Sequence, residues 1–399
     1  MGQLFSMALL GNSRNSESPP DHPDLLLVHL ETGVAGSVSF HLPTHYSEAE
    51  FLGGGAYGSV CQALDTSRTK DQKVAIKKMK EPFRDGERAR RAFRELRLLR
   101  LFQHDNVVDL VDVYAECDKP QEMDTFYLVT AYAGYTLAQC IREGVLSDDH
   151  FRFVIYQILR GLKYIHSGGV IHRDLKPTNM ALTGDCHLTI LHFGLARKLR
   201  ADFMTEYVVA RYYRAPEVIF WNGIYDLKAD VWSVGCILGE MLLGRVLFKG
   251  ENQIDQFLKI TEICGSPDTP LLEKIEKDCS LSTRQMIERM KRHERRDFRS
   301  VFPGAASDAV DLVEKLLVLD PDKRLSVAEA LSHAYLNRPG DNYHVESDEP
   351  IFMGDVSLND NDCDTKDLLG WRMKVWREIQ LFRQEKRRAS SQNGASSSS

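Results

Sequence analysis

The order of the predicted elements constrains the fold of this 399-residue chain more than any other feature. Strand-like runs at residues 51–78 and 106–131 flank one predicted helix at residues 88–102. Beyond Gly134, apolar residues recur at helical spacing over residues 148–166, 229–243, 253–263 and 308–319. Strands followed by helices, instead of alternating with them, are typical of α+β proteins. We therefore expect an α+β fold with a small β-rich part and a larger helical part.

The two ends of the chain differ from this body in composition. Residues 25–42 contain two strand-like runs around Glu31-Thr32-Gly33, which predicts a hairpin in an N-terminal extension, residues 1–45, that is otherwise partly disordered. Residues 346–364 predict an acidic loop and residues 365–382 a helix. The Ser-rich residues 384–399 predict a disordered tail.

Composition excludes several classes of function. With 57 acidic and 51 basic residues the net charge is −6, so we expect no nucleic-acid partner. The eight cysteines form no CxxC pair, which favours reduced thiols in the cytoplasm or nucleus. The longest apolar run, residues 231–248, is interrupted by Glu240 and Arg245, so no membrane span is expected. The first six residues fit the N-myristoylation pattern at Gly2, although one acyl chain anchors only marginally.

A glycine pattern, Gly53-x-Gly55-x-x-Gly58-x-Val60, carries the first chemical signal. Glycines let backbone N–H groups approach phosphate oxygens closely. The same spacing occurs in dinucleotide-binding turns, but those require a helix directly after the glycines. Here strand-like runs follow instead, which indicates a flap over nucleotide phosphates with Lys77 reaching in from the neighbouring strand. Glu95, on the predicted helix, is the candidate partner of Lys77.

A second motif spans residues 171–179 and reads Ile-His-Arg-Asp-Leu-Lys-Pro-Thr-Asn. Asp174 is a candidate base that could orient and deprotonate a substrate hydroxyl. Lys176 could neutralise charge that develops on a transferred phosphoryl group. Asn179 offers a neutral oxygen, the ligand type that Mg²⁺ prefers.

Together these motifs make residues 46–382 resemble a eukaryotic protein kinase, and more closely a mitogen-activated protein (MAP) kinase. Further stretches that carry the resemblance lie at residues 214–217, 230–235, 319–325 and 376–382. Residues 156–167 most resemble the stress-activated branch, whereas the triplet Thr205-Glu206-Tyr207 is more typical of the growth-factor-activated branch. The resemblance implies the bilobal kinase fold, with an N-lobe at residues 46–132 and a C-lobe at residues 133–345. An acidic docking segment and C-terminal helix would follow at residues 346–383.

The resemblance also implies an activity, transfer of the ATP γ-phosphate to Ser or Thr before Pro, with Mg²⁺ or Mn²⁺ as the metal. Thr130 would gate the back of the adenine pocket and Tyr132 would contribute backbone to adenine. The full set implied for nucleotide binding is Leu52, Gly53, Gly54, Gly55, Ala56, Tyr57, Gly58, Ser59, Val60, Ala75, Lys77, Glu95, Thr130 and Tyr132.

A phosphorylation switch is implied at Thr205 and Tyr207, which a dual-specificity upstream MAP kinase kinase would modify. A phosphate group demands guanidinium partners. The implied partners are Arg91, Arg94, Arg173 and Arg197 for Thr205, and Arg211 and Arg214 for Tyr207. Glu346, Asp348 and Glu349 resemble the patch that receives basic docking motifs of substrates and phosphatases, although an acidic run can also be plain solvated surface. Such a protein would work in stress signalling in the cytoplasm and nucleus.

Two departures from the family pattern affect the catalytic centre. His192-Phe193-Gly194 stands where the family has Asp-Phe-Gly, whose Asp holds Mg²⁺. Imidazole suits zinc or copper better than Mg²⁺. Ala210 replaces a threonine whose hydroxyl would tie Asp174 to Lys176. The sequence therefore leaves two readings open: a working MAP-type kinase, or a pseudokinase or strongly impaired kinase that acts as a scaffold or competitor.

Overall fold

The chain divides into two compact units. The computed structural model describes residues 24–32, 36–67, 72–199, 211–220, 226–278, 285, 287, 289–338, 350–356, 358 and 367–396. Unit 1 comprises Met1–Gln103, Val108–Tyr132 and Ser357–Ser399, and unit 2 comprises His104–Val107 and Ala133–Val356.

Unit 1 is built on a five-stranded antiparallel sheet with the strand order β3-β4-β5-β7-β6. The strands are β3 (Tyr46–Gly55), β4 (Gly58–Asp65), β5 (Gln72–Met79), β6 (Leu110–Ala115) and β7 (Phe126–Ala131). A separate hairpin pairs β1 (Leu25–Glu31) with β2 (Ser37–Pro43). The β1–β2 pairing agrees with the predicted hairpin, but its turn, residues 33–35, lies outside the described residues.

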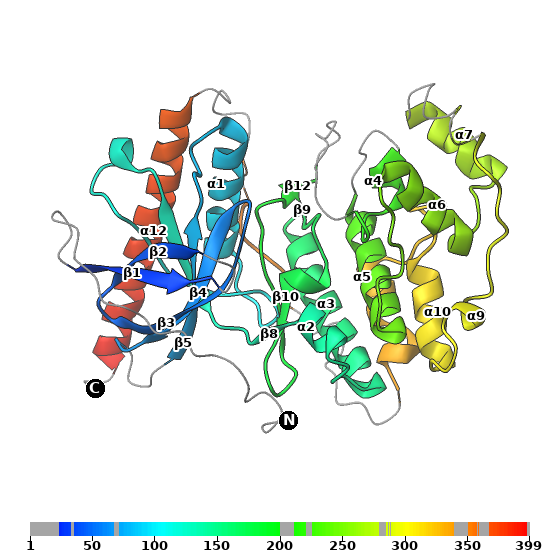
Figure 1. The fold of residues 1–399 in the computed structure, drawn as a ribbon, viewed down its shortest axis with the longest axis horizontal. Helices are drawn as coiled ribbons and strands as arrows, with labels where there is room; N and C mark the ends of the chain where they lie inside the picture. The colour runs from blue at the N-terminus through cyan, green and yellow to red at the C-terminus, as the bar shows by residue number, and fades with distance from the viewer. Residues whose placement is uncertain are drawn as a thin grey trace. The chain divides into compact units, whose positions relative to one another are not determined.

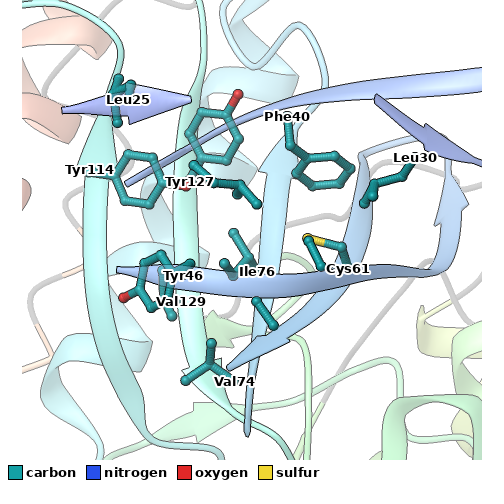
Figure 2. Close-up of a cluster of buried hydrophobic side chains, with 13 residues drawn as sticks. Leu25, Leu30, Phe40, Tyr46, Cys61, Val74, Ile76, Tyr114, Tyr127 and Val129 are labelled. Atoms are coloured by element: carbon teal, nitrogen blue, oxygen red, sulfur yellow. The ribbon is translucent and has the colours of Figure 1, made fainter. Parts of the chain in front are cut away.

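The hairpin is held to the sheet by a shared apolar core (Figure 2). Leu30 and Phe40 of the hairpin pack with Cys61 and Ile76 of β4 and β5. Burial of a side chain such as Phe40, which is fully inaccessible, contributes about 1.5–3 kcal/mol. The same burial raises the pKa of the Cys61 thiol to about 12, so this cysteine stays a neutral, apolar core residue.

Two helices complete unit 1 and run alongside each other in Figure 1. Helix α1 (Gly86–Leu101) begins at Asp85, whose carboxylate accepts a hydrogen bond from the Arg88 amide at 2.8 Å. Helix α12 (Leu368–Ser396) buries Trp371 with its ring 5.8 Å from that of Phe93 on α1.

The prediction of a disordered tail from residue 384 is wrong for residues 384–396, because α12 continues through them. Residues 397–399 lie outside the described part. Glu385 accepts a hydrogen bond from Arg100 of α1 at 2.6 Å, and Lys386 donates to Asp112 of β6 at 2.8 Å. These tertiary contacts, with strong helix formers at residues 384–389, outweigh the Ser-rich composition.

Unit 2 is mainly helical, so the α+β class expected from the sequence is confirmed. Its helices are α2 (Leu137–Arg142), α3 (Asp148–Ser167), α4 (Pro216–Phe220), α5 (Leu227–Leu243), α6 (Gln253–Cys264), α7 (Thr269–Asp278), α9 (Phe298–Val301), α10 (Ser307–Leu316) and α11 (Val327–Leu331). Helix α10 ends three residues before the predicted 319, since Leu317 leaves the helical conformation. Among the described residues, no helix combines the length and apolar character needed to cross a bilayer.

Short strands in unit 2 position the loops that carry its polar motifs. β10 (Met180–Leu182) pairs with β11 (Leu188–Ile190) and β8 (Tyr135–Thr136), and β9 (Val170–Ile171) pairs with β12 (Arg197–Lys198). The residues between β9 and β10 contain a 3₁₀ turn, η2 (Pro177–Asn179). Two further 3₁₀ turns are η1 (Pro120–Glu122) in unit 1 and η3 (Ala334–Leu336) in unit 2. All these strands are two or three residues long, so they fix loop ends rather than build a core.

Candidate active site

The glycine pattern lies on the hairpin formed by β3 and β4 in unit 1. Gly55 pairs with Gly58, so Ala56 and Tyr57 form the turn between the strands. A Cβ atom added at Gly53 or Gly55 would meet nothing within 4 Å, whereas one at Gly58 would lie 2.5 Å from the Lys78 carbonyl oxygen. The first two glycines therefore leave open space above the strand, and the third is required by the pairing of β4 with β5.

The flanking residues of this hairpin are partly open to solvent. Leu52 and Tyr57 are exposed, and the Arg91 guanidinium lies 4.7 Å from the centre of the Tyr57 ring. Ser59 and Val60 lie on β4, where Val60 pairs with Lys77 across the sheet. The remaining predicted residue of the pattern, Gly54, pairs with Ser59.

Lys77 forms a buried ion pair within unit 1. Its Nζ donates to Oε1 of Glu95 on α1 at 2.6 Å, and only 15% and 6% of the two side chains is accessible. Removing one partner of such a pair costs about 3–5 kcal/mol, since the other charge is left buried. The pairing expected from the sequence between Lys77 and Glu95 is thus present in the structure.

The strand register places the other predicted nucleotide residues of unit 1 near Lys77. Ala75 pairs with Thr130 of β7, and the Thr130 hydroxyl donates to the Ala75 carbonyl at 3.5 Å. The Tyr132 amide, just past β7, donates to the Lys73 carbonyl at 3.3 Å. Sheet pairing therefore brings together two parts of the sequence that are 55 residues apart.

In unit 2, the Asp174 carboxylate is held by two donors from its own loop. Lys176 Nζ lies 2.9 Å from Oδ2 and 3.1 Å from Oδ1. The Asn179 side-chain amide donates to the Asp174 carbonyl at 2.8 Å and to Oδ2 at 2.7 Å. The turn η2 makes this possible, because it brings Asn179 back toward Asp174. The three predicted residues therefore form one hydrogen-bonded cluster.

A buried carboxylate on α5, Asp230, anchors the backbone of this loop. It accepts hydrogen bonds from the amides of His172 and Arg173, each at 2.8 Å, and His166 Nε2 lies 2.9 Å from its Oδ2. Burial acts to raise the pKa of Asp230, but the hydrogen bond and charge of His166, the charge of His172 and the Arg173 amide outweigh it, and the pKa lies below its ordinary value. These bonds hold Arg173 at a φ of 69°.

The anchoring role of Asp230 was not predicted from the sequence, where this residue is part of a family motif. A usable signal was present, since Asp230 is the one acidic residue in the otherwise apolar run at residues 229–239. A carboxylate in a fully buried helix is expected to have several hydrogen-bond donors around it.

His192 also lies in a left-handed conformation, with a φ of 59°. The adjacent Leu191 amide donates to the Asn179 carbonyl at 2.9 Å, which ties residues 191–193 to the Asp174 loop. The Leu191 carbonyl lies 3.2 Å from His172 Nε2, and burial lowers the pKa of that His172 ring. Asn, Asp and His are the non-glycine residues that most often adopt positive φ. Histidine therefore keeps the backbone geometry that an aspartate would have here.

The side chains around His192 do not fit Mg²⁺. The Asp174 carboxylate is already engaged by Lys176 and Asn179, and His192 offers only a nitrogen ligand. Asp185, the next carboxylate along the chain, is exposed and accepts a hydrogen bond from the Thr183 hydroxyl in the turn between β10 and β11. Over the described ranges, no three His, Cys, Asp or Glu residues are grouped so that they could hold a metal ion.

The predicted phosphate-binding arginines are divided between the units. Arg91 and Arg94 are buried on α1 of unit 1, whereas Arg173, Arg197, Arg211 and Arg214 are half-buried in unit 2. The sites of modification, Thr205 and Tyr207, lie outside the described residues, as does Ala210. The docking residues Glu346, Asp348 and Glu349 and the acylation site Gly2 are also outside them.

Comparison with known proteins identifies the class. Residues 46–336 match the model of the protein kinase domain, and the chain belongs to the protein kinase family, with unit 1 as its β-sheet N-lobe and unit 2 as its helical C-lobe.

Among curated proteins it is similar to mitogen-activated protein kinases of the p38 type. It is 44% identical to mitogen-activated protein kinase pmk-3 of Caenorhabditis elegans, over 87% of this chain and 75% of that one. Identity to pmk-1 of the same organism is 44%, over 86% of this chain and 87% of the relative. Identity to mitogen-activated protein kinase 14 of Xenopus laevis is 43%, over 86% and 92%.

The resemblance stated from the motifs is therefore confirmed, as are the kinase fold and the assignment to MAP-type serine/threonine kinases.

Proposed function

We propose that this protein is a MAP-type serine/threonine kinase that binds ATP and transfers its γ-phosphate slowly to Ser or Thr before Pro. The observation that carries the proposal is the Asp174 cluster: a carboxylate held by Lys176 and Asn179, with a histidine where a metal-binding aspartate is expected. The Asp174 carboxylate provides a base for the acceptor hydroxyl, whereas the histidine at 192 removes the usual carboxylate ligand of the metal.

Unit 1 supplies the residues that would hold the nucleotide. The open space at Gly53 and Gly55 lets backbone amides approach phosphate oxygens, which a Cβ atom would obstruct. Lys77 would provide the positive charge for the phosphates, and Glu95 fixes its direction through the 2.6 Å contact. ATP contributes the transferred phosphoryl group, and these side chains bind and orient it.

Unit 2 supplies the groups for the acceptor. Asp174 would accept the hydroxyl proton of a substrate Ser or Thr, which makes the oxygen a better nucleophile. Lys176 would offset negative charge on the phosphoryl oxygens as the bond to the leaving group breaks. Asp230 keeps the loop in place through the amides of His172 and Arg173.

Phosphoryl transfer would be slow because the side chains around His192 do not fit Mg²⁺. Loss of the metal carboxylate removes several kcal/mol of transition-state stabilisation, or roughly a 10³-fold slower step. Ala210, where the family has threonine, would loosen Asp174 further. The two changes also favour a second candidate, a pseudokinase that binds partners without phosphoryl transfer.

Regulation and partners follow from family membership. Phosphorylation of Thr205 and Tyr207 by an upstream MAP kinase kinase would order the activation segment through the arginines named above. Substrates and phosphatases with basic docking motifs would bind the acidic residues at 346, 348 and 349. These interactions would take place in the cytoplasm and nucleus.

A phosphotransfer assay on the doubly phosphorylated chain tests this proposal, with a Ser-Pro peptide as acceptor. We expect slow transfer by the wild type and none by Asp174→Asn, with equal ATP affinity for the two proteins. Turnover of the wild type in the usual kinase range of about 1–100 s⁻¹ would contradict the slowing by His192. ATP binding with no transfer above the Asp174→Asn level would favour the pseudokinase.

A further inference from the structure

The inner face of α12 is fully engaged by unit 1. Trp371, Val375 and Ile379 are buried, and Glu378 accepts hydrogen bonds from Arg97 at 2.6 Å and from Arg100 at 2.8 Å. The other acidic residue of the helix, Glu385, also faces α1 through Arg100. Both negative charges of α12 are thus used on its inner face.

The outer face of α12 carries the opposite charge. Over residues 368–396 the helix has seven basic residues against two acidic ones. At 3.6 residues per turn, positions 369, 373, 377, 383 and 387 fall on the side opposite Trp371 and Glu378, and position 388 lies at the edge of that side, about 80° from Glu378. We name this set the basic face, and its members are Leu369, Met373, Arg377, Arg383, Arg387 and Arg388.

The charges of the basic face are not neutralised within the described part of the protein. None of its four arginines forms an ion pair with a described carboxylate, and Arg377, Arg387 and Arg388 are exposed. Leu369 and Met373, one turn apart near the start of the helix, are each 49% exposed. Four unpaired arginines on a protein of net charge −6 are a local feature that the composition does not explain.

We propose that the basic face of α12 binds the surface of a membrane that contains anionic phospholipids. The arginines of the basic face would lie at the anionic headgroups, and the exposed Leu369 and Met373 would contact the interface beside them. Each basic side chain close to an anionic surface strengthens binding about fivefold.

Two other polyanionic partners fit less well. An acidic protein that encloses a basic amphipathic helix would need the apolar side of that helix, but Trp371, Val375 and Ile379 are buried in unit 1. A nucleic acid would use the arginines but gain nothing from exposed Leu369 and Met373.

Vesicle co-sedimentation of the full chain, without an acyl group at Gly2, tests the proposal. We expect the wild type to bind phosphatidylserine-containing vesicles at low salt, to bind weakly at physiological salt, and not to bind pure phosphatidylcholine vesicles. The triple variant Arg383→Gln/Arg387→Gln/Arg388→Gln should lower the partition coefficient on the order of 100-fold. The pair Leu369→Gln/Met373→Gln should lower it by a smaller factor.

The matched control is Arg289→Gln/Arg296→Gln/Arg299→Gln in unit 2, which changes the net charge equally at exposed arginines. This control should bind vesicles like the wild type, and thermal unfolding should show all variants folded. Equal loss in the control and the α12 variant would overturn the proposal, as would the absence of binding by the wild type at low salt. Binding of RNA or DNA without binding of vesicles would overturn it in favour of a nucleic-acid surface.

Discussion

His192 and Arg173 share an uncommon property, a positive φ at a non-glycine residue beside the candidate base. The cost of such a conformation is of order 1–3 kcal/mol, and surrounding bonds must hold it. Asp230 does so for Arg173, and the Leu191 amide, bonded to Asn179, flanks His192. Since aspartate also tolerates a positive φ, we expect His192→Asp to alter the ligand chemistry and to keep the loop conformation.

Replacement of Asp230 by asparagine should lower the free energy of unfolding by about 2–4 kcal/mol, because an amide cannot accept all the bonds that the carboxylate accepts. Thermal or urea unfolding at neutral pH measures the loss.

The loss of stability caused by Asp230→Asn should become smaller as the pH falls. The pKa of Asp230 lies below its ordinary value in the folded protein, so an unfolded chain takes up its proton first as the pH falls. The stability that Asp230 contributes is therefore present above the ordinary aspartate pKa and is lost as the pH falls through the folded-state pKa. A gap between wild type and Asp230→Asn that widens on acidification would contradict this account.

Replacement by alanine should have different effects at Gly58 and at Gly53 of the same motif. Gly58→Ala should destabilise the protein by about 1–3 kcal/mol, since the new Cβ would lie 2.5 Å from the Lys78 carbonyl and push β4 from β5. Gly53→Ala, whose Cβ meets nothing within 4 Å, should change stability by under about 1 kcal/mol and weaken ATP binding instead. Urea unfolding and nucleotide titration of both variants make the comparison, and equal destabilisation would count against the distinction.

At the scale of elements, the contact between α1 and α12 carries the most weight for unit 1. Glu378 is almost fully buried and bonded to both Arg97 and Arg100, on the helix that also presents Glu95 to Lys77. The C-terminal helix thereby supports the position of the candidate nucleotide-binding pair.

The variant Glu378→Gln should cost about 3–5 kcal/mol of stability, because two arginine side chains lose their buried counter-charge. We also expect weaker ATP binding, through a less fixed α1. The control Glu385→Gln removes a half-exposed partner of Arg100 and should cost under about 1 kcal/mol. Thermal unfolding of both variants measures the two losses of stability. Similar losses would show that burial of Glu378 does not determine how much it stabilises the protein.

Element boundaries were predictable where local signals are strong. Helix α3 was predicted at residues 148–166 and spans Asp148–Ser167, with Ser147 capping its first turn. The length of α12 was underestimated, because the Ser-rich composition after residue 389 was given more weight than the helix formers at residues 384–389 and contacts such as that between Arg100 and Glu385 were not foreseeable. A low-complexity, Ser-rich composition describes local preference only, and tertiary contacts override it.

At the scale of the whole molecule, the motifs identified the candidate site but not its supports. Lys77, Glu95, Asp174, Lys176 and Asn179 were all recognisable, since each sits at a fixed place in a motif. The partners of Asp230, two backbone amides 57 and 58 residues away and the His166 side chain, were not predicted, because only the fold brings them to the one carboxylate in this apolar run. The expectations for Thr205, Tyr207, Ala210 and the acidic docking residues stay predictions, since they fall outside the described residues.

The division into units also differs from a division by sequence order. Unit 1 takes its residues from both ends of the chain, with Ser357–Ser399 returning to the segment that carries the glycine motif. The sequence suggested one lobe after another, because periodicity finds elements and cannot tell which distant element covers which. Helix α12, predicted within a segment that follows the C-lobe in sequence, belongs to unit 1.

The measurement that tests the central claim most directly is the turnover number of His192→Asp relative to wild type. Both proteins would be doubly phosphorylated and assayed on one Ser-Pro peptide with Mg²⁺, and again with Mn²⁺, which accepts nitrogen ligands more readily. The account predicts a gain of at least about 10²-fold for His192→Asp with Mg²⁺, a smaller gain with Mn²⁺, and little change in ATP affinity. Equal turnover of the two proteins with Mg²⁺ would contradict it.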